Sequence, residues 1–259
     1  MKITEAYVTK NPCYRAARKL AVKGLMLHSV GTPQPKAEVF VNTFNSVSLQ
    51  KCVHGFIDGN TGEVYQTLPW SFKAWHCGGS GNDTHIGIEM CEPATIRYTG
   101  GSTFVDNDYK ASRNVVWTAY RSAVELFAYL CRQYGLDPLK DIVSHAEGHK
   151  KGIASNHGDP EHVWKKYGFT MDGFRADVKR AMEDDGEMVE RINAIINGKT
   201  VPMNRILKDG YNYIKIRDVA SELGFNIEYQ RSIPVFTPER EAVIKWAKEL
   251  GIRPEELYG

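Results

Sequence analysis

The amino-acid sequence predicts an α/β protein, with a central mixed β-sheet flanked by helices and a small α+β C-terminal domain. Short apolar runs typical of strands alternate with segments in which apolar residues recur every three or four positions. Such alternation favours a sheet covered by helices. An abrupt acidic stretch at residues 183–187 separates a first domain, residues 1–183, from a second, residues 184–259.

The first half of the chain supplies most of the predicted sheet. Residues 23–30 form an apolar run that predicts a strand, and residues 37–49 predict a helix. Residues 52–57 and 64–68 predict a hairpin, because the Asn and Gly residues between them suit a tight reversal. Residues 85–91 alternate apolar with small or polar positions and predict a central strand.

A long helix and three shorter elements complete the first domain. Residues 113–134 carry apolar side chains at helical spacing, and Gly135 provides the stop. Residues 98–108 are rich in Gly, Thr and Asp and predict a loop that walls a groove. A short strand is expected at 141–144 and a closing helix at 173–182.

The second domain contains two strand segments around Asn197-Gly198, a strong signal for a two-residue hairpin turn. The last segment begins with Thr237 and Pro238 followed by acidic residues, which is a typical helix start. The apolar face of that helix needs a partner, either the small domain or a second chain. The predicted elements are strands at 191–196, 198–204, 211–214 and 225–229 and helices at 216–223 and 237–250.

Two histidines and one aspartate from separate segments predict a metal site. His28 ends an apolar strand, His145 follows a second strand, and Asp159 precedes Pro160. Two imidazoles and a carboxylate are a recurring ligand set for catalytic zinc, since three protein ligands leave the fourth tetrahedral position open. The pattern therefore indicates a metallohydrolase.

Glu89 is an acidic residue inside the apolar strand 85–91. An ionised carboxylate is costly in such a position unless a partner or a metal lies nearby. Glu89 is therefore a candidate for the group that takes a proton from water and returns it to a leaving nitrogen.

Other histidines compete for the ligand roles. His145 and His149 have the spacing of one helical face, but Gly148 and Gly152 predict a loop there, which removes the geometric basis for pairing them. His149 and His162 are interpreted as solvated loop residues. Two further histidines are interpreted as strand or edge residues: His54 and His85.

These motifs, taken in order, resemble the zinc N-acetylmuramoyl-L-alanine amidases. This is the type 2 amidase family, which also contains phage endolysins and the peptidoglycan recognition proteins, and the resemblance covers roughly residues 20–168. The motifs that carry it are Leu27-His28, Val53-His54-Gly55-Phe56, Gly62-Glu63-Val64-Tyr65-Gln66, Trp75-His76-Cys77-Gly78-Gly79, Ile86-Gly87-Ile88-Glu89, Val143-Ser144-His145 and Asp159-Pro160.

The resemblance implies a fold, a Zn²⁺ cofactor and a set of roles. It assigns the metal to His28, His145 and Asp159, places Glu89 as the acid that activates water, and puts a substrate groove beside two residues. Those groove residues are Trp75 and His76. The implied fold is that of the amidases and peptidoglycan recognition proteins.

The chain departs from the family pattern at two positions. His157 stands where many members have a lysine that is thought to stabilise the oxyanion, and Val53 lies near the place of a tyrosine used by others. His157 is predicted to be catalytic in the lysine's place. Unlike lysine, an imidazole can lose its charge near neutrality.

The implied reaction is hydrolysis of the amide bond between the lactyl group of N-acetylmuramic acid and L-alanine, with peptidoglycan as the partner. Two alternatives are a non-catalytic peptidoglycan-binding module and a glycosidase that uses Glu89 with Glu92. The second domain resembles the small copper amine oxidase N-terminal-like module, and the resemblance implies cell-wall attachment or self-association.

Composition limits the partners and the cellular compartment that we expect for the protein. A net charge of +2 without an arginine-rich stripe argues against a nucleic-acid partner. No run reaches the length of a membrane span, and the N-terminus lacks the apolar core of a signal peptide. The five cysteines are odd in number and widely spaced, which predicts buried free thiols and a reducing compartment. We therefore expect a protein made in the cytoplasm that reaches the cell wall after release, as a phage or prophage endolysin does.

Overall fold

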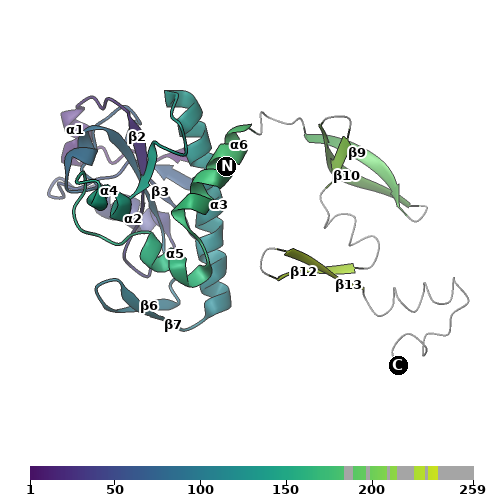
Figure 1. The fold of residues 1–259 in the computed structure, drawn as a ribbon. Coiled ribbons are helices and arrows are strands. Elements are labelled where there is room, and N and C mark those ends of the chain that lie inside the picture. Colours follow the sequence, from purple (N-terminus) through teal and green to yellow (C-terminus); the bar gives the residue numbers. More distant parts are fainter. Residues whose placement is uncertain (184–188, 197–198, 209–210, 215–224, 231–232, 239–259) are drawn as a thin grey trace, which may run out of the picture. The chain divides into compact units, whose positions relative to one another are not determined.

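The computed structural model describes residues 1–183 and, beyond them, 189–196, 199–208, 211–214, 225–230 and 233–238 (Figure 1). The chain divides into two compact units, Met1–Asp184 and Asp185–Gly259. Among the described residues, no helix has the length and apolar character needed to cross a membrane.

A mixed six-stranded sheet forms the centre of the first unit. Its strand order is β1-β4-β3-β5-β2-β8. Only β3 and β4 pair in antiparallel fashion; the other neighbouring strands are parallel. The strands are β1 (Ile3–Glu5), β2 (Gly24–Ser29), β3 (Gly55–Ile57), β4 (Val64–Gln66), β5 (His85–Met90) and β8 (Ile142–Ser144). The predicted hairpin and central strand are therefore confirmed.

Helices flank this sheet, as predicted. The 26-residue helix α3 (Tyr109–Tyr134) begins at Asp108, whose side chain accepts a hydrogen bond from the amide of Ala111, and ends at Gly135 with φ 65°. Figure 1 shows α6 running alongside α3. The other helices are α1 (Pro12–Ala16), α2 (Ala37–Phe44), α4 (His145–Lys150), α5 (Glu161–Tyr167), α6 (Met171–Glu183) and the 3₁₀ helix η1 (Ser80–Asp83).

The segment predicted as a loop at 98–108 is largely a hairpin, so that prediction was wrong. Strand β6 (Ile96–Gly100) pairs antiparallel with β7 (Thr103–Asp106). The glycines that suggested a loop make its turn, since Gly100 and Gly101 have φ values of 155° and 52°. The threonines and apolar residues on either side favour strands.

The loop predicted after His145 is a helix, α4, which is a second correction. Ser144 and Glu147 form a capping box at its start. Gly148 lies inside the helix because a side chain there would meet Met26, whose Cε would be 2.9 Å from an added Cβ. This glycine is a packing requirement and does not break the helix.

A third correction concerns the cysteines. Cys13 and Cys52 form a disulfide, whereas Cys77, Cys91 and Cys131 are free and buried as predicted. The paired cysteines share a small buried cluster with residues from several segments. Folding brings them together across 39 positions, which spacing alone does not reveal, so the cysteine argument for a reducing compartment loses its basis.

The second unit contains two antiparallel sheets among its described residues. One has the order β11-β10-β9, and the other pairs β12 with β13. The strands are β9 (Val189–Ile196), β10 (Lys199–Lys208), β11 (Tyr211–Ile214), β12 (Phe225–Gln230) and β13 (Ile233–Pro238). The hairpin predicted around Asn197-Gly198 is confirmed by the β9–β10 pairing.

The two helices predicted in the second unit fall wholly or largely on residues that the structure does not describe. The helix predicted at 216–223 lies outside the described residues. Thr237 and Pro238, expected to start the final helix, instead end strand β13, and residues 239–250 also lie outside the described residues.

Asn11 ties the N-terminus to the segment after α2. Its Oδ1 accepts a hydrogen bond from the amide of Cys13, and its Nδ2 lies 2.9–3.1 Å from the carbonyl oxygens of Phe44, Leu49 and Lys51. Asn11→Ala removes the cap and leaves buried carbonyl groups without this donor. We expect it to lower the free energy of unfolding in urea by about 2–4 kcal/mol.

Asn11→Asp provides the comparison for that experiment, because it keeps the capping oxygen but replaces the amide donor with a carboxylate oxygen that faces the three carbonyl oxygens. It should keep the cap and still lose stability, because a carboxylate cannot donate to these oxygens and repels them. An Asn11→Asp protein as stable as the wild type would show that the three carbonyl contacts contribute nothing.

Candidate metal centre

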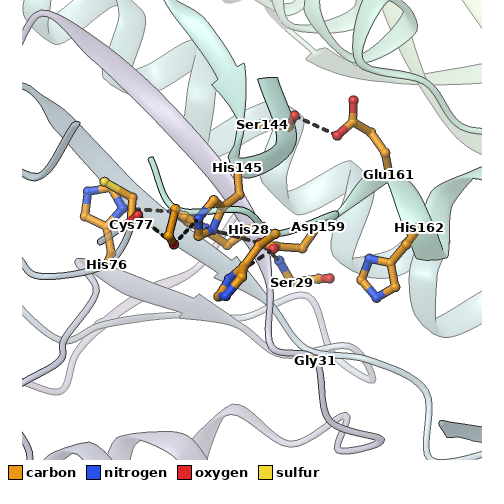
Figure 2. A network of polar contacts seen from close by, with 12 residues as sticks. His28, Ser29, Gly31, His76, Cys77, Ser144, His145, Asp159, Glu161 and His162 are labelled. Carbon is orange, nitrogen blue, oxygen red and sulfur yellow. Dashed lines mark hydrogen bonds and ion pairs between the residues drawn. The ribbon is translucent and has the colours of Figure 1, made fainter. Parts of the chain in front are cut away.

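Three separate elements bring His28, His145 and Asp159 together (Figure 2). His28 lies in β2, His145 is the first residue of α4 directly after β8, and Asp159 precedes α5. Strands β2 and β8 are parallel neighbours, so their carboxyl ends meet at one edge of the sheet. The three residues are only 1%, 2% and 8% exposed.

The donor atoms of these residues have the spacing of a tetrahedral metal site. The Nδ1 atoms of His28 and His145 are 3.0 Å apart, and they lie 3.2 and 3.5 Å from Oδ2 of Asp159. Zinc ligands at about 2.0–2.1 Å in tetrahedral directions lie about 3.3 Å from one another. Two nitrogens and one carboxylate oxygen are also a donor set that zinc accepts, so the residues fit the ion.

The electrostatics of the cluster suit a cation. Burial lowers the pKa of His28 more than the carboxylate of Asp159 raises it, so the imidazole is neutral and offers a lone pair. Burial alone would raise the pKa of Asp159, but its contacts with the imidazoles of His145 and His28 outweigh burial and hold the pKa below its usual range. The buried carboxylate therefore stays ionised beside the two ligand imidazoles.

The Nε2 atoms of His28 and His145, which do not face Asp159, also have hydrogen-bond partners. Nε2 of His28 lies 2.9 Å from Nδ1 of His76, and Nε2 of His145 lies 3.2 Å from the hydroxyl of Ser155. That hydroxyl in turn donates to the carbonyl oxygen of Cys77. Both ligands are therefore held from the side away from Asp159.

His76 was predicted to line a substrate groove, and it borders the cavity beside the cluster. However, Nδ1 contacts His28 and Nε2 lies 3.1 Å from the carbonyl oxygen of His85. Burial lowers the pKa of His76 well below its usual range. Both of its nitrogens are thus engaged by the protein.

Glu89 lies next to His28 across the β2–β5 pairing and borders the same cavity. Its Oε2 is buried and has no hydrogen-bond partner among the described residues. Burial, followed by the negative charges of Asp159 and Glu92, raises the pKa of Glu89 well above its usual value. A carboxyl group with a raised pKa in a cavity is a candidate for proton transfer.

Two further predicted site residues lie at the rim of the cavity. The ring of His157 is 4.5 Å from that of His145, and its side chain is 63% exposed. Trp75 is half-buried, and the guanidinium of Arg18 lies 5.0 Å from the centre of its indole ring. The geometry brings both residues to the site without fixing their roles.

His162 is not a solvated loop residue, and the prediction that it would be was wrong. It lies in α5 with a partly buried side chain, and its Nε2 is 2.7 Å from the hydroxyl of Tyr98. That hydroxyl donates to the carboxylate of Glu92, which also accepts from the amide of Gly31. The sequence does not reveal this network, because Tyr98 falls in the segment predicted to be a loop. His149, by contrast, is exposed as predicted, although it lies on α4.

The hydrogen bonds of Glu92 argue against the alternative that the protein is a glycosidase using Glu89 and Glu92. Glu92 is buried, is engaged by Tyr98 and Gly31, and does not border the cavity. It is therefore not available as the second carboxylate of a glycosidase. His54 and His85 are also engaged elsewhere, with Nε2 of His54 bonded to the carbonyl oxygen of Phe72.

The cavity itself is large, at about 1240 Å³. Part of its lining is apolar and comes from α2, another part comes from the turn of the β6–β7 hairpin, and Glu89 also lines it. The lining residues include Phe40, Phe44, Tyr98, Gly101 and Ser102.

Comparison with known proteins agrees with this geometry. A family model described as N-acetylmuramoyl-L-alanine amidase matches residues 18–162, more than half of the chain. A probable N-acetylmuramoyl-L-alanine amidase of Bacillus licheniformis is 25% identical over 280 residues, covering 100% of this chain and 71% of the relative. The amidase BlyA of Bacillus subtilis is 26% identical over 149 residues, covering 55% of this chain and 39% of BlyA.

Solved structures share the fold. The hydrolase AmiA of Staphylococcus aureus, in complex with its ligand, superposes with a TM-score of 0.54 at 21% identity, covering 70% of this chain and 83% of AmiA. The catalytic domain of XlyA gives 0.50 at 22% identity, covering 69% of this chain and 99% of XlyA. The predicted fold class is confirmed.

The buried carboxyl groups of Glu89 and Glu92 make a matched pair for a stability test. The pKa of Glu89 is raised in the folded protein, so above about pH 4.5 the unfolded chain releases this proton while the folded chain holds it. Its contribution to stability therefore falls as the pH rises. In metal-free protein we expect Glu89→Gln to be more stable than wild type at pH 7, by a margin that grows from acid to neutral pH.

Glu92→Gln should instead lose stability, although burial raises the pKa of Glu92 as well. It disturbs the hydrogen bonds from Tyr98 and Gly31, so urea unfolding should show a loss of about 1–3 kcal/mol. A Glu89→Gln protein less stable than wild type at every pH would contradict the assignment of an unpartnered, unfavourably buried carboxylate.

Proposed function

Because the chain belongs to the N-acetylmuramoyl-L-alanine amidase family, we propose that it is a zinc-dependent peptidoglycan hydrolase. The bond it cuts joins the lactyl group of N-acetylmuramic acid to the L-alanine of the stem peptide. The observation that carries the proposal is the buried cluster of His28, His145 and Asp159, whose donor atoms lie within 4.8 Å of one another.

The metal would be held by His28 and His145 through Nδ1 and by Asp159 through Oδ2. A zinc ion supplies a Lewis acid that makes water a nucleophile and polarises an amide carbonyl at neutral pH. The donors themselves contribute one negative charge, so the site keeps a net positive charge once the ion is held. That charge favours the oxygen on which negative charge develops.

Glu89 would move the protons of the reaction. Its carboxyl group borders the same cavity as the cluster, and its pKa is raised by burial and by neighbouring acids. A carboxylate with a raised pKa accepts a proton from water more readily and can return it to the amine that leaves. Such proton transfer typically accelerates a reaction by about 10²–10⁴-fold.

His157 would contact the oxygen of the scissile carbonyl. Its imidazole packs beside that of His145 at the open side of the cluster, where substrate enters. An N–H group in this position stabilises developing negative charge by donating a hydrogen bond. The role is supported by location alone and replaces the lysine of related sequences.

The cavity would hold the sugar and the peptide on either side of the cluster. Its apolar α2 wall offers Phe40 and Phe44, and the opposite side offers the hairpin turn at Gly101 and Ser102. A volume of about 1240 Å³ exceeds the range of about 300–1,000 Å³ usual for drug-sized ligands. A muramyl peptide is a ligand large enough to use it.

Residues 184–259 would attach the enzyme to the cell wall or associate with a second copy, and the enzyme would act on the wall after release, as an endolysin does. These roles come from sequence resemblance and stay predictions.

Metal removal tests the cofactor. We expect a chelator to abolish hydrolysis and to lower Tm, because an ion that binds only the folded state stabilises it. One equivalent of zinc should restore both, and Asp159→Ala should show neither the chelator effect nor the restoration. His149→Ala is the matched control, since this exposed histidine on α4 contacts none of the three donors. Full activity after complete metal removal would contradict a metal mechanism.

Digestion of purified peptidoglycan, analysed by mass spectrometry, tests the bond and the proton-transfer group together. Wild type should release stem peptides with a free L-alanine amino group and create no new reducing ends. Glu89→Gln should slow release by about 10²–10⁴-fold, whereas Glu92→Gln should retain far more activity. New reducing ends, or equal loss in both variants, would point to a glycosidase, and binding without products would indicate a recognition module.

A further inference from the structure

We infer that His76 and Ser155 are positioning residues that fix both ligand imidazoles in the one neutral tautomer that leaves Nδ1 free for a metal ion. The inference rests on the proposed metal site and adds a requirement to it. A neutral imidazole carries one proton, and the nitrogen that carries it cannot ligate a metal. Each ligand must therefore keep its proton on Nε2.

The hydrogen bonds determine the tautomer of His76 first. Its Nε2 lies 3.1 Å from the carbonyl oxygen of His85. A carbonyl oxygen can only accept a hydrogen bond, so Nε2 of His76 must carry the proton and its Nδ1 must be an acceptor. That Nδ1 lies 2.9 Å from Nε2 of His28. The proton of His28 is therefore on Nε2, and its Nδ1 lone pair is directed at Asp159 and His145.

The same reasoning applies to His145 by a separate route. The hydroxyl of Ser155 gives its only proton to the carbonyl oxygen of Cys77, at 3.1 Å. The oxygen of Ser155, 3.2 Å from Nε2 of His145, must then accept. His145 consequently carries its proton on Nε2 and presents Nδ1 to the cluster. Both chains of hydrogen bonds end on a backbone carbonyl group, which cannot reverse its role.

The surroundings of His76 hold its ring in place for the contact with His28. Its backbone amide donates to the side chain of Asn82, at 2.8 Å. Gly87 makes room for the ring, because a Cβ at that position would come within 2.4 Å of it. A cation in the cluster would need the two imidazoles and the carboxylate in their present orientation, and His76 holds the most buried of them.

The first test reads the tautomer directly, in metal-free protein. Long-range ¹⁵N NMR of the histidine-labelled full-length chain distinguishes Nδ1–H from Nε2–H, and His28→Gln and His145→Gln identify the signals. At about pH 8.5, roughly two units above the ordinary imidazole pKa, we expect the Nε2–H form for both ligands. His76→Leu should make His28 a mixture of tautomers and leave His145 unchanged, and Ser155→Ala should do the converse.

The second test measures zinc affinity by competition with a chelator. Loss of a group that orients a ligand typically costs about 10–100-fold in metal affinity, and we expect a loss in this range for His76→Leu. His76→Asn, which has nearly the shape of leucine but offers an acceptor close to the place of Nδ1, should recover part of it. An Asn variant no better than the Leu variant would show that only the filling of space matters.

His54→Gln is the matched control. His54 is buried, donates from Nε2 to the carbonyl oxygen of Phe72 and accepts at Nδ1 from the amide of Gly87, but it does not contact His28. Its substitution should change zinc affinity less than about twofold.

Equal losses in His54→Gln and His76→Leu, or an unchanged His28 tautomer in His76→Leu, would overturn the inference. Neither readout requires hydrolysis, so an enzyme that binds zinc but cuts another bond would refute the proposed function and leave this inference standing.

Discussion

The arrangement of this molecule depends on one constraint, which is that three polar side chains are removed from water within bonding distance of one another. His28, His145 and Asp159 are almost wholly buried, and an isolated buried carboxylate costs several kcal/mol. The cluster is tolerable only if a positive charge compensates the carboxylate and if every remaining nitrogen has a partner. A cation meets the first condition, and the hydrogen bonds that His28 and His145 donate to His76 and Ser155 meet the second.

Parallel strands explain why these groups converge at all. The pairing of β2 with β5 and β8 sets His28 level with Glu89 and brings the residue after β8, His145, to the same edge. A slip of one residue in either pairing would turn the alternating side chains to the opposite face of the sheet. The apolar side chains of these strands, buried under α3 and α6, therefore fix the register on which the site depends.

The sequence predicted what is local or chemically distinctive. The apolar run ending at His28, the carboxylate of Glu89 inside a strand and the periodicity of 113–134 each carry their own signal, and the structure has a strand, a buried acid and a helix there. What it missed depends on distant partners. Gly148 predicted a loop, but the structure shows that it is a glycine because Met26 packs against it. The sequence did not indicate that Cys13 pairs with Cys52, and the role of His162 is visible only from its contact with Tyr98.

Two histidines beside Gly87, the buried His54 and the partly buried His76, share the same local hydrogen-bonding pattern but differ in what they contact. His54 and His76 each give the Nε2 proton to a backbone carbonyl oxygen, and each thereby becomes an acceptor at Nδ1. For His54 the group that donates to Nδ1 is the amide of Gly87, so its chain of bonds closes within the sheet. For His76 the donor is Nε2 of His28. The carbonyl oxygen that accepts from His76 therefore also determines which nitrogen of His28 carries the proton, and it leaves Nδ1 of His28 free to face the cluster. The two histidines differ in the group that donates to Nδ1, which is a backbone amide for His54 and a predicted metal ligand for His76. The sequence around each histidine does not reveal this difference.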